Sequence, residues 1–191
     1  TIAREAFHSG VDYVSAYIFS IENWNRAKEE VDYLMNLAIK MAQRDLRELI
    51  AENIKIVVLG IEDRVPKKVI DAWRQAEEDS RNNTGGMLAL CFNYGGFREI
   101  TDAVKNIVQT GIGAEDITDD LVKEHLYLPE IPPVDLMIRT SGEQRLSGFM
   151  LPRMAYAELY FSPKPWPAFT VADLHEAFSE YSHRQRRFGG N

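Results

Sequence analysis

Short apolar runs, rich in β-branched and aromatic residues and without alternation, recur along the chain and predict strands buried on both faces. Four clear runs and a weaker fifth have this pattern: Val11–Phe19, Ile54–Leu59, Met87–Phe92, Val134–Ile138 and Ala157–Phe161. Three stretches between them favour helices: Val31–Ile50, Val65–Ser80 and Phe97–Gln109. Strands that alternate with helices of this length form right-handed crossovers, so we predict an α/β fold with a mostly parallel central sheet.

Composition narrows the range of functions. The 191 residues fit one domain, and no apolar run approaches the roughly 18 residues that a membrane span needs. The net charge of −7 disfavours a nucleic-acid surface, so an anionic ligand must be bound by a local basic cluster. The single cysteine, Cys91, cannot form an internal disulfide and suggests a reducing compartment.

The polar segment Phe19–Arg26 directly follows the first predicted strand. Ligands of α/β proteins bind at the carboxyl ends of strands, so this segment is a candidate site. Arg26 offers a fork of donors suited to a phosphate, and Ser20 and Asn23 can position a proton or a water. Trp24 supplies an apolar wall. A surface turn in which Asn23 caps a helix and Trp24 belongs to the core explains the same residues equally well.

A second polar segment, Asp135–Ser147, runs from the fourth predicted strand into a loop. Arg139 and Arg145, with hydroxyl groups around them, form a plausible cradle for a diphosphate. Gly142 allows a close approach of the backbone. Scattered charges in contact with solvent are the alternative interpretation.

A third segment, Ala155–Phe161, places one carboxylate, Glu158, inside an apolar run. A buried unpaired carboxylate is costly, so Glu158 must pair with a cation or a metal ion. Mg²⁺ bound through one or two carboxylates and substrate phosphates is one solution, and a structural salt bridge is the other.

Together these segments resemble the motifs of the cis-prenyltransferase family, which includes undecaprenyl diphosphate synthase. The matching motifs are Phe-Ser-x-Glu-Asn-Trp-x-Arg, Asp-Leu-x-Ile-Arg-Thr-Ser-Gly-Glu-x-Arg-Leu-Ser and Tyr-Ala-Glu-Leu-Tyr-Phe, in the family's order. Asn93–Gly96 is similar to the family's Asn-Tyr-Gly-Gly element. Arg186–Gly190 is similar to its C-terminal motif, which reaches across a dimer interface.

The resemblance implies an activity, a cofactor and an assembly. Isopentenyl diphosphate would be condensed onto an allylic diphosphate such as farnesyl diphosphate, giving a polyprenyl diphosphate of undecaprenyl or related length. The implied enzyme depends on Mg²⁺, forms a homodimer and has an apolar tunnel between helices and sheet. With an apolar product, we expect it in the cytoplasm and in peripheral contact with a membrane surface.

By matching position, the resemblance also assigns roles to residues. The implied catalytic residues, near the reacting carbons, are Ser20, Asn23 and Trp24. The implied diphosphate-binding residues are Arg26, Arg139, Arg145 and Ser147, together with Arg187 and Gly189, which would complete the partner subunit's site. The implied Mg²⁺ ligand is Glu158.

The sequence departs from the family's pattern in several places. The Asp-Gly-Asn-Gly-Arg-type phosphate loop, with the family's principal Mg²⁺-binding aspartate, is not found in residues 1–191. We therefore expect residues 1–191 to be a cis-prenyltransferase domain that lacks its N-terminal phosphate-loop segment and does not catalyse alone. Phe97, Gly148 and Pro152–Arg153 stand where Arg, Asn and Trp-Gln are usual.

Two other functions compete with the enzyme. One is a catalytically inert partner subunit of a heteromeric prenyltransferase, but a scaffold has no use for the retained Arg139 and Arg145. The other is a doubly wound binding module, but the glycine fingerprints of nucleotide-binding loops are missing from the sequence. The four histidines have no metal-ligand spacing, so none is assigned to a metal.

Overall fold

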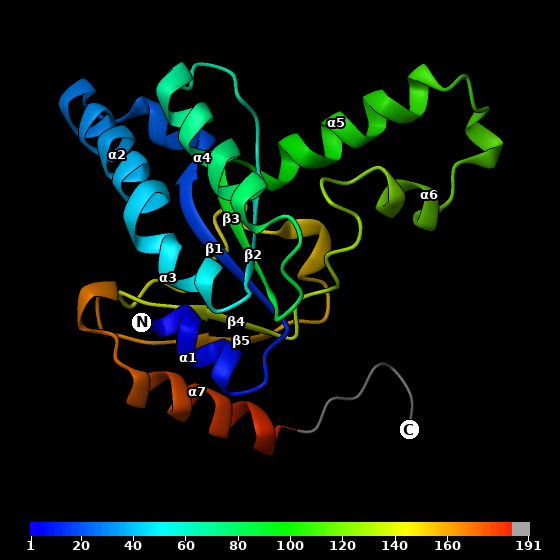
Figure 1. Cartoon of the computed structure of the whole chain (residues 1–191). Helices are drawn as coiled ribbons and strands as arrows, with labels where there is room; N and C mark the ends of the chain where they lie inside the picture. Colours follow the sequence, from blue (N-terminus) through cyan, green and yellow to red (C-terminus); the bar gives the residue numbers. More distant parts are fainter. Residues whose placement is uncertain (185–191) are drawn as a thin grey trace.

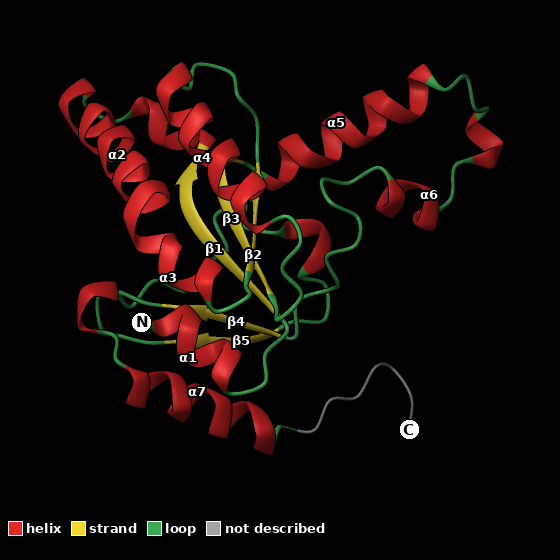
Figure 2. Cartoon of the chain, viewed as in Figure 1, coloured by secondary structure: helices red, strands yellow, loops and turns green. Residues whose placement is uncertain are grey.

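The computed structural model describes residues 1–184, in which five strands form two parallel sheets flanked by helices (Figure 1, Figure 2). The strands are β1 Tyr13–Ser20, β2 Lys55–Leu59, β3 Met87–Tyr94, β4 Leu136–Arg139 and β5 Glu158–Phe161. Each overlaps a predicted apolar run and all ladders are parallel, so the predicted α/β fold is confirmed. β3 lies between β1 and β2, while β4 and β5 pair with each other in a separate ladder.

The helices of the described part are α1 Ile2–His8, α2 Lys28–Lys40, α3 Leu46–Ala51, α4 Lys67–Ser80, α5 Gly96–Gln109, α6 Asp119–Glu124 and α7 Val171–His183. The helix predicted over Val31–Ile50 is found as α2 and α3, separated by a π-helical turn at Met41–Asp45. The other two predicted helices are α4 and α5. Within residues 1–184, no helix combines the length and the apolar character that crossing a membrane requires.

β3 has an apolar core on each face because its residues alternate between them. Leu88, Leu90 and Phe92 face α2, α3 and α4, and Ala89 and Cys91 belong to the opposite core. The continuous apolar run that predicted this strand is therefore explained by its burial on both sides.

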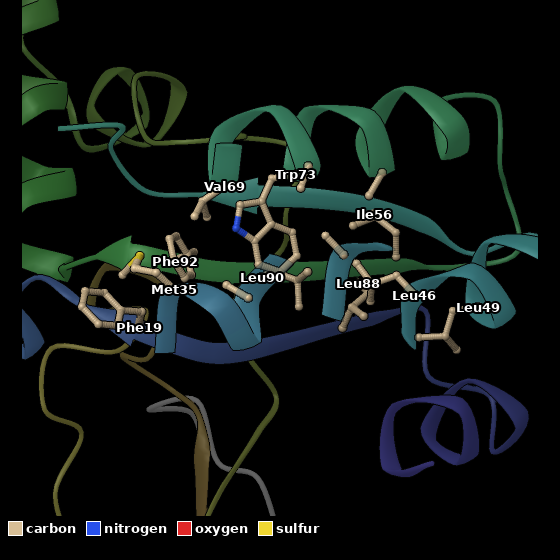
Figure 3. Close-up of a cluster of buried hydrophobic side chains, with 14 of the residues drawn as sticks. Phe19, Met35, Leu46, Leu49, Ile56, Val69, Trp73, Leu88, Leu90 and Phe92 are labelled. Carbon is tan, nitrogen blue, oxygen red and sulfur yellow. The ribbon is translucent and has the colours of Figure 1, made fainter. Parts of the chain in front are cut away.

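Aliphatic side chains and a few aromatic rings fill the core between the helices and the first sheet (Figure 3). Phe19 and Trp73 both lie against Phe92, with ring centroids 5.5 Å and 5.6 Å from it. Met35 of α2 packs in the same cluster. The apolar tunnel expected between helices and sheet stays a prediction.

The opposite core joins the loop after β4 to the sheet. Met150, the last residue of this loop, is fully buried and packs with Met137 of β4 and with Cys91 of β3. On the far side of β4 and β5, α1 and α7 pack together through Ala6 and Leu174 (Figure 1). Apolar contacts therefore hold the two sheets in fixed relation, so the loops at their ends have a defined position.

The chain leaves β2 through Gly60, which lies directly against the backbone of β3. Its φ of 147° is a conformation open essentially to glycine alone. A Cβ at this position would lie 1.8 Å from the carbonyl oxygen of Phe92. The turn after β2 therefore depends on the absence of a side chain.

We expect Gly60→Ala to destabilise the fold far more than Gly111→Ala. Both glycines have a positive φ, but a Cβ at Gly111 meets nothing within 4 Å. Gly111→Ala should cost only the left-handed backbone penalty of about 1–2 kcal/mol. Gly60→Ala should add at least about 1–3 kcal/mol of overpacking against β3. Urea unfolding followed by circular dichroism measures both, and equal losses would contradict the close approach.

Candidate active site

Three chain segments meet at the carboxyl-terminal edge of the first sheet. Ser20 and Tyr94, the last residues of β1 and β3, are paired in register, so the segments that follow them leave the sheet together. The loop after β4, residues 140–150, reaches the same place, because the amide of Gly96 donates to the carbonyl oxygen of Gly148 at 2.8 Å. This edge is where parallel α/β proteins bind ligands.

Tyr17 of β1 ties this loop to the sheet. Its hydroxyl lies within hydrogen-bonding distance of the carbonyl oxygens of Tyr94, at 3.2 Å, and Ser147, at 3.4 Å. Its ring stacks on Phe149, with centroids 4.9 Å apart. Burial raises the pKa of Tyr17 to about 12, so the phenol stays neutral and able to donate at physiological pH.

The residues predicted to bind isopentenyl diphosphate come together in this loop. Arg139, the last residue of β4, donates through Nη1 to Ser147 Oγ at 3.0 Å and to the carbonyl oxygen of Arg145. The guanidinium of Arg145 forms an ion pair with Glu143. The Arg139 guanidinium and the Ser147 hydroxyl therefore lie together at one strand end, and the backbone of Arg145 lies beside them, while its side chain is paired with Glu143. Arginine donors and a hydroxyl in one loop suit a diphosphate.

The loop holds this arrangement with an unusual backbone. Ser141, Ser147 and Met150 all have positive φ angles, at 70°, 50° and 47°. Such conformations cost a non-glycine residue about 1–2 kcal/mol each and gather at functional sites. Gly148 also has a positive φ, 77°, so glycine fits the position where the family usually has Asn.

The segment after β1 forms the helix-capping turn that was the alternative to a catalytic role for its residues. Ser20 and Asn23 form a capping box at the start of the 3-10 helix Ile21–Asn25, and Asn23 Oδ1 accepts from the amide of Ser20 at 3.0 Å. The Trp24 ring meets Phe19 edge-on. The catalytic roles of Ser20, Asn23 and Trp24 stay predictions, because these contacts neither require nor exclude them.

Asn93 links this segment to the end of the sheet. Trp24 Nε1 donates to Asn93 Oδ1 at 2.7 Å, and Asn93 Nδ2 donates to the carbonyl oxygens of Ile61 and Asp63, both at 2.8 Å. Arg64 stacks over the Trp24 ring, 4.6 Å from its centroid. The sequence pointed to Asn93 only as part of a motif. A polar residue near the end of an otherwise apolar strand was the signal that could have revealed its role.

Two predicted site residues have partners away from the Arg139 cluster. Arg26 pairs with Glu30 at the start of α2, and both side chains are exposed. Glu158 pairs with Arg184 at 2.9 Å, which is the salt bridge that the sequence offered as one solution, but the side chain is 29% exposed and so is not buried as expected. Predicted Arg187 and Gly189 lie outside the described residues.

Glu158 lies at the other end of the short sheet from Arg139. In the register of β4 and β5, Glu158 is opposite Leu136, whereas Arg139 is opposite Phe161. Three residues of strand separate the two levels by about 10 Å. The structure therefore does not join the predicted metal ligand to the predicted diphosphate cradle.

Residues 1–184 meet the requirements of Mg²⁺ only in part. They hold no group of three or more His, Cys, Asp or Glu side chains placed to bind a metal ion. Glu158 offers one carboxylate, which Arg184 already engages. One carboxylate can serve Mg²⁺ only if phosphate oxygens or other ligands complete the coordination.

Comparison with known proteins gives a consistent answer. The family model "Putative undecaprenyl diphosphate synthase" matches residues 1–189. The isoprenyl transferase of Thermotoga maritima is 44% identical over 183 residues, which are 95% of this chain and 78% of that protein. The isoprenyl transferase of Staphylococcus haemolyticus is 41% identical over 194 residues, covering 100% of this chain and 76% of that protein.

Solved structures agree with these matches. The crystal structure of lavandulyl diphosphate synthase from Lavandula x intermedia, in complex with dimethylallyl diphosphate, has a TM-score of 0.93 and 35% identity, covering 98% of this chain and 83% of that chain. A probable undecaprenyl diphosphate synthase from Campylobacter jejuni has a TM-score of 0.89 and 28% identity, covering 98% and 88%.

The parallel strands, the arginines and hydroxyls at their ends and these matches define a prenyltransferase, an enzyme of isoprenoid biosynthesis that acts on isoprenoid diphosphates. More narrowly, the chain belongs to the undecaprenyl diphosphate synthase family, whose model matches nearly its whole length.

We expect Tyr17→Phe to lower the free energy of unfolding by about 1 kcal/mol at pH 7, because a hydrogen bond is lost while the ring stack remains. Because the pKa of Tyr17 is raised in the folded protein, its contribution to the free energy of unfolding should fall at alkaline pH. Stability from the neutral phenol is fully present below its ordinary pKa near 10 and is lost as pH rises through about 12. The difference between wild type and variant should therefore shrink between these values in urea unfolding series.

Tyr13→Phe is the matched control, because Tyr13 is an exposed tyrosine on the same strand. It should leave the free energy of unfolding nearly unchanged. A Tyr17→Phe difference that stays constant up to pH 12 would contradict the assigned role of the buried phenol.

Proposed function

We propose that the full-length protein condenses isopentenyl diphosphate onto an allylic diphosphate such as farnesyl diphosphate, giving a polyprenyl diphosphate with cis double bonds. The observation that carries this proposal is the cluster of Arg139, Arg145 and Ser147 at the end of β4. The family membership supports the class of reaction. Undecaprenyl or a related length is the product that we propose.

The proposed condensation requires groups that stabilise diphosphate charge, and the arginines of this chain are of that kind. The carbon–oxygen bond of the allylic diphosphate breaks, and the diphosphate leaves with the electron pair. The double bond of isopentenyl diphosphate then supplies the electrons of the new carbon–carbon bond, and loss of a proton sets the new double bond. Fixed arginines stabilise the phosphate charge throughout. We assign this task to Arg139 and Arg145, with Arg26 at a diphosphate.

We also propose that Mg²⁺ takes part, with Glu158 as its ligand from this chain. A bound Mg²⁺ would neutralise diphosphate charge. This role requires Glu158 to exchange its contact with Arg184 for the metal. It also requires the diphosphate to come within reach of Glu158, which lies about 10 Å along the strands from Arg139. We place Ser20, Asn23 and Trp24 near the reacting carbons, and we expect the enzyme to work in the cytoplasm, beside the membrane that takes up its lipid product.

The test is incorporation of radiolabelled isopentenyl diphosphate by the full-length protein, with farnesyl diphosphate and Mg²⁺. Wild type should form an extractable polyprenyl product. Arg139→Met should lower kcat/KM for isopentenyl diphosphate about 10- to 100-fold, because charged hydrogen bonds contribute about 1.5–3 kcal/mol each. EDTA should abolish incorporation, and added Mg²⁺ should restore it.

Arg44→Met is the control for loss of an arginine, because Arg44 is exposed on the π-helical turn and pairs with its neighbour Asp45. It should leave incorporation unchanged. If folded wild-type homodimer incorporates no label, the inert partner subunit becomes the better explanation. If wild type is active and Arg139→Met equals it, the assignment of the cradle is wrong.

A homodimer is our second proposal, and the outer face of α5 supports it. This helix projects from the rest of the described part (Figure 1) and exposes Phe97, Val104 and Val108, at 76%, 48% and 66%. Their spacing places them on one stripe of the helix. Such an exposed apolar stripe is typical of an interaction surface, and it can pair with its own copy about a two-fold axis.

We expect Val104→Glu with Val108→Glu to convert the dimer to a monomer, because two carboxylates would face the same apolar surface of the partner. Light scattering during size-exclusion chromatography measures the mass. Asn106→Glu, an exposed position on the other side of α5, is the control and should remain dimeric. A dimer that survives the double substitution would place the interface elsewhere.

A further inference from the structure

A buried ion pair joins the start of α5 to the segment that follows the 140–150 loop. Arg153 Nη1 lies 2.7 Å from Glu99 Oε1, and the two side chains are only 4% and 0% exposed. Glu99 belongs to the first turn of α5, and Arg153 ends the 3-10 helix Leu151–Arg153, shortly after the 140–150 loop. Arg153 is one of the residues that depart from the family's usual pattern.

The partners of this pair belong to several segments. Arg153 Nη2 donates to the carbonyl oxygen of Tyr127 at 2.6 Å, and Arg153 Nε donates to that of Ile131 at 3.3 Å. Glu99 accepts from the amide of Tyr127 at 3.0 Å and from the hydroxyl of Tyr94. A buried charge needs such partners, and here they come from β3, α5 and the 127–131 connection.

The Glu99–Arg153 pair and the Gly96–Gly148 hydrogen bond both attach the loop region to the first turn of α5. Gly96, three residues before Glu99, donates to the carbonyl oxygen of Gly148. At the end of the loop, the amide of Val134, just before β4, donates to the carbonyl oxygen of Arg153 at 2.9 Å. The entry to β4 and the end of the loop are therefore joined at Arg153.

Stability alone does not require this pair. Replacing a buried ion pair with apolar side chains of similar volume is often neutral or stabilising. Apolar side chains do not fix an orientation through directional hydrogen bonds. The Arg153 guanidinium does, because three of its nitrogens have partners and only one orientation satisfies them all. The residue that carries it is thereby held in one place, and so is the loop end.

We infer that Glu99 and Arg153 are positioning residues that hold the 140–150 loop in the conformation in which Arg139, Arg145 and Ser147 lie together. They set the affinity for the diphosphate group without touching it. This inference rests on the proposed function, because it takes the cluster around Arg139 as the diphosphate site.

The test compares binding with turnover in the full-length protein. The double variant Glu99→Leu/Arg153→Met removes both charges and keeps most of the volume. We expect its Kd for inorganic pyrophosphate, measured by isothermal titration calorimetry, to rise at least tenfold. KM for isopentenyl diphosphate should rise similarly, while kcat at saturation changes less than threefold, because the reacting groups are untouched.

Arg153→Lys is the second variant and keeps the buried charge while losing the fork of donors. It should raise the Kd for pyrophosphate by a smaller factor, and it decides the question if the double variant fails to fold. Arg4→Met, which breaks the surface contacts of Arg4 with Glu48 and Glu52, is the control and should leave the Kd unchanged.

The outcomes separate the inference from the proposed function. Folded variants that bind pyrophosphate as tightly as wild type, while wild type incorporates isopentenyl diphosphate, overturn the positioning role alone. Weakened pyrophosphate binding by the variants, together with a wild type that incorporates no label, supports the positioning role and overturns the proposed reaction.

Discussion

The end of β3 is the constraint on which the site depends. This strand has a hydrogen-bonded neighbour on each edge and an apolar core on each face, so its final residues have a fixed position. There the backbone turns through Asn93 with a φ of 49°, and the side-chain amide is bonded through both Oδ1 and Nδ2. Because a buried amide is costly without partners, the segments that supply them must come to it. Trp24 and the turn after β2 therefore gather around this strand end, and the loop after β4 joins it separately, through the contacts of Gly96 with Gly148 and of Tyr17 with Ser147.

The structural contacts of the segment after β1 are compatible with the chemical role proposed for it. Asn23 caps a short helix, as expected of an ordinary turn, and Trp24 donates to Asn93, a contact that the sequence did not predict. The same contacts hold the two side chains rigid, which is what a site needs for residues placed near reacting carbons. Arg26, in contrast, pairs with Glu30 in an exposed i,i+4 contact, which contributes little and is readily exchanged for a phosphate.

The sequence predicted the parts of this structure that depend on local pattern. The continuous apolar run Met87–Phe92 predicted a strand buried on both faces, and the position of Arg139 at the end of an apolar run indicated a cation at a strand end. The break at Met41–Asp45 left no trace because apolar spacing continues through it. No helix was predicted over α7, although Thr170 and Asp173 have the spacing of a capping box and mark its start. The contact between Glu99 and Arg153 could not be predicted, because it joins residues 54 positions apart.

Three residues that depart from the family's usual pattern lie on the first turn of α5 or contact it. Phe97 points outward from that turn, Gly148 lies against Gly96, and Arg153 pairs with Glu99. A glycine at 148 permits the positive φ that brings the loop backbone to the helix, and an arginine at 153 then holds the end of the same loop. Because both contacts are made to the same helical turn, substitutions at positions 148 and 153 can have non-additive effects on stability. Three of the departures, Phe97, Gly148 and Arg153, therefore belong to or contact the first turn of α5, where that turn meets the loop.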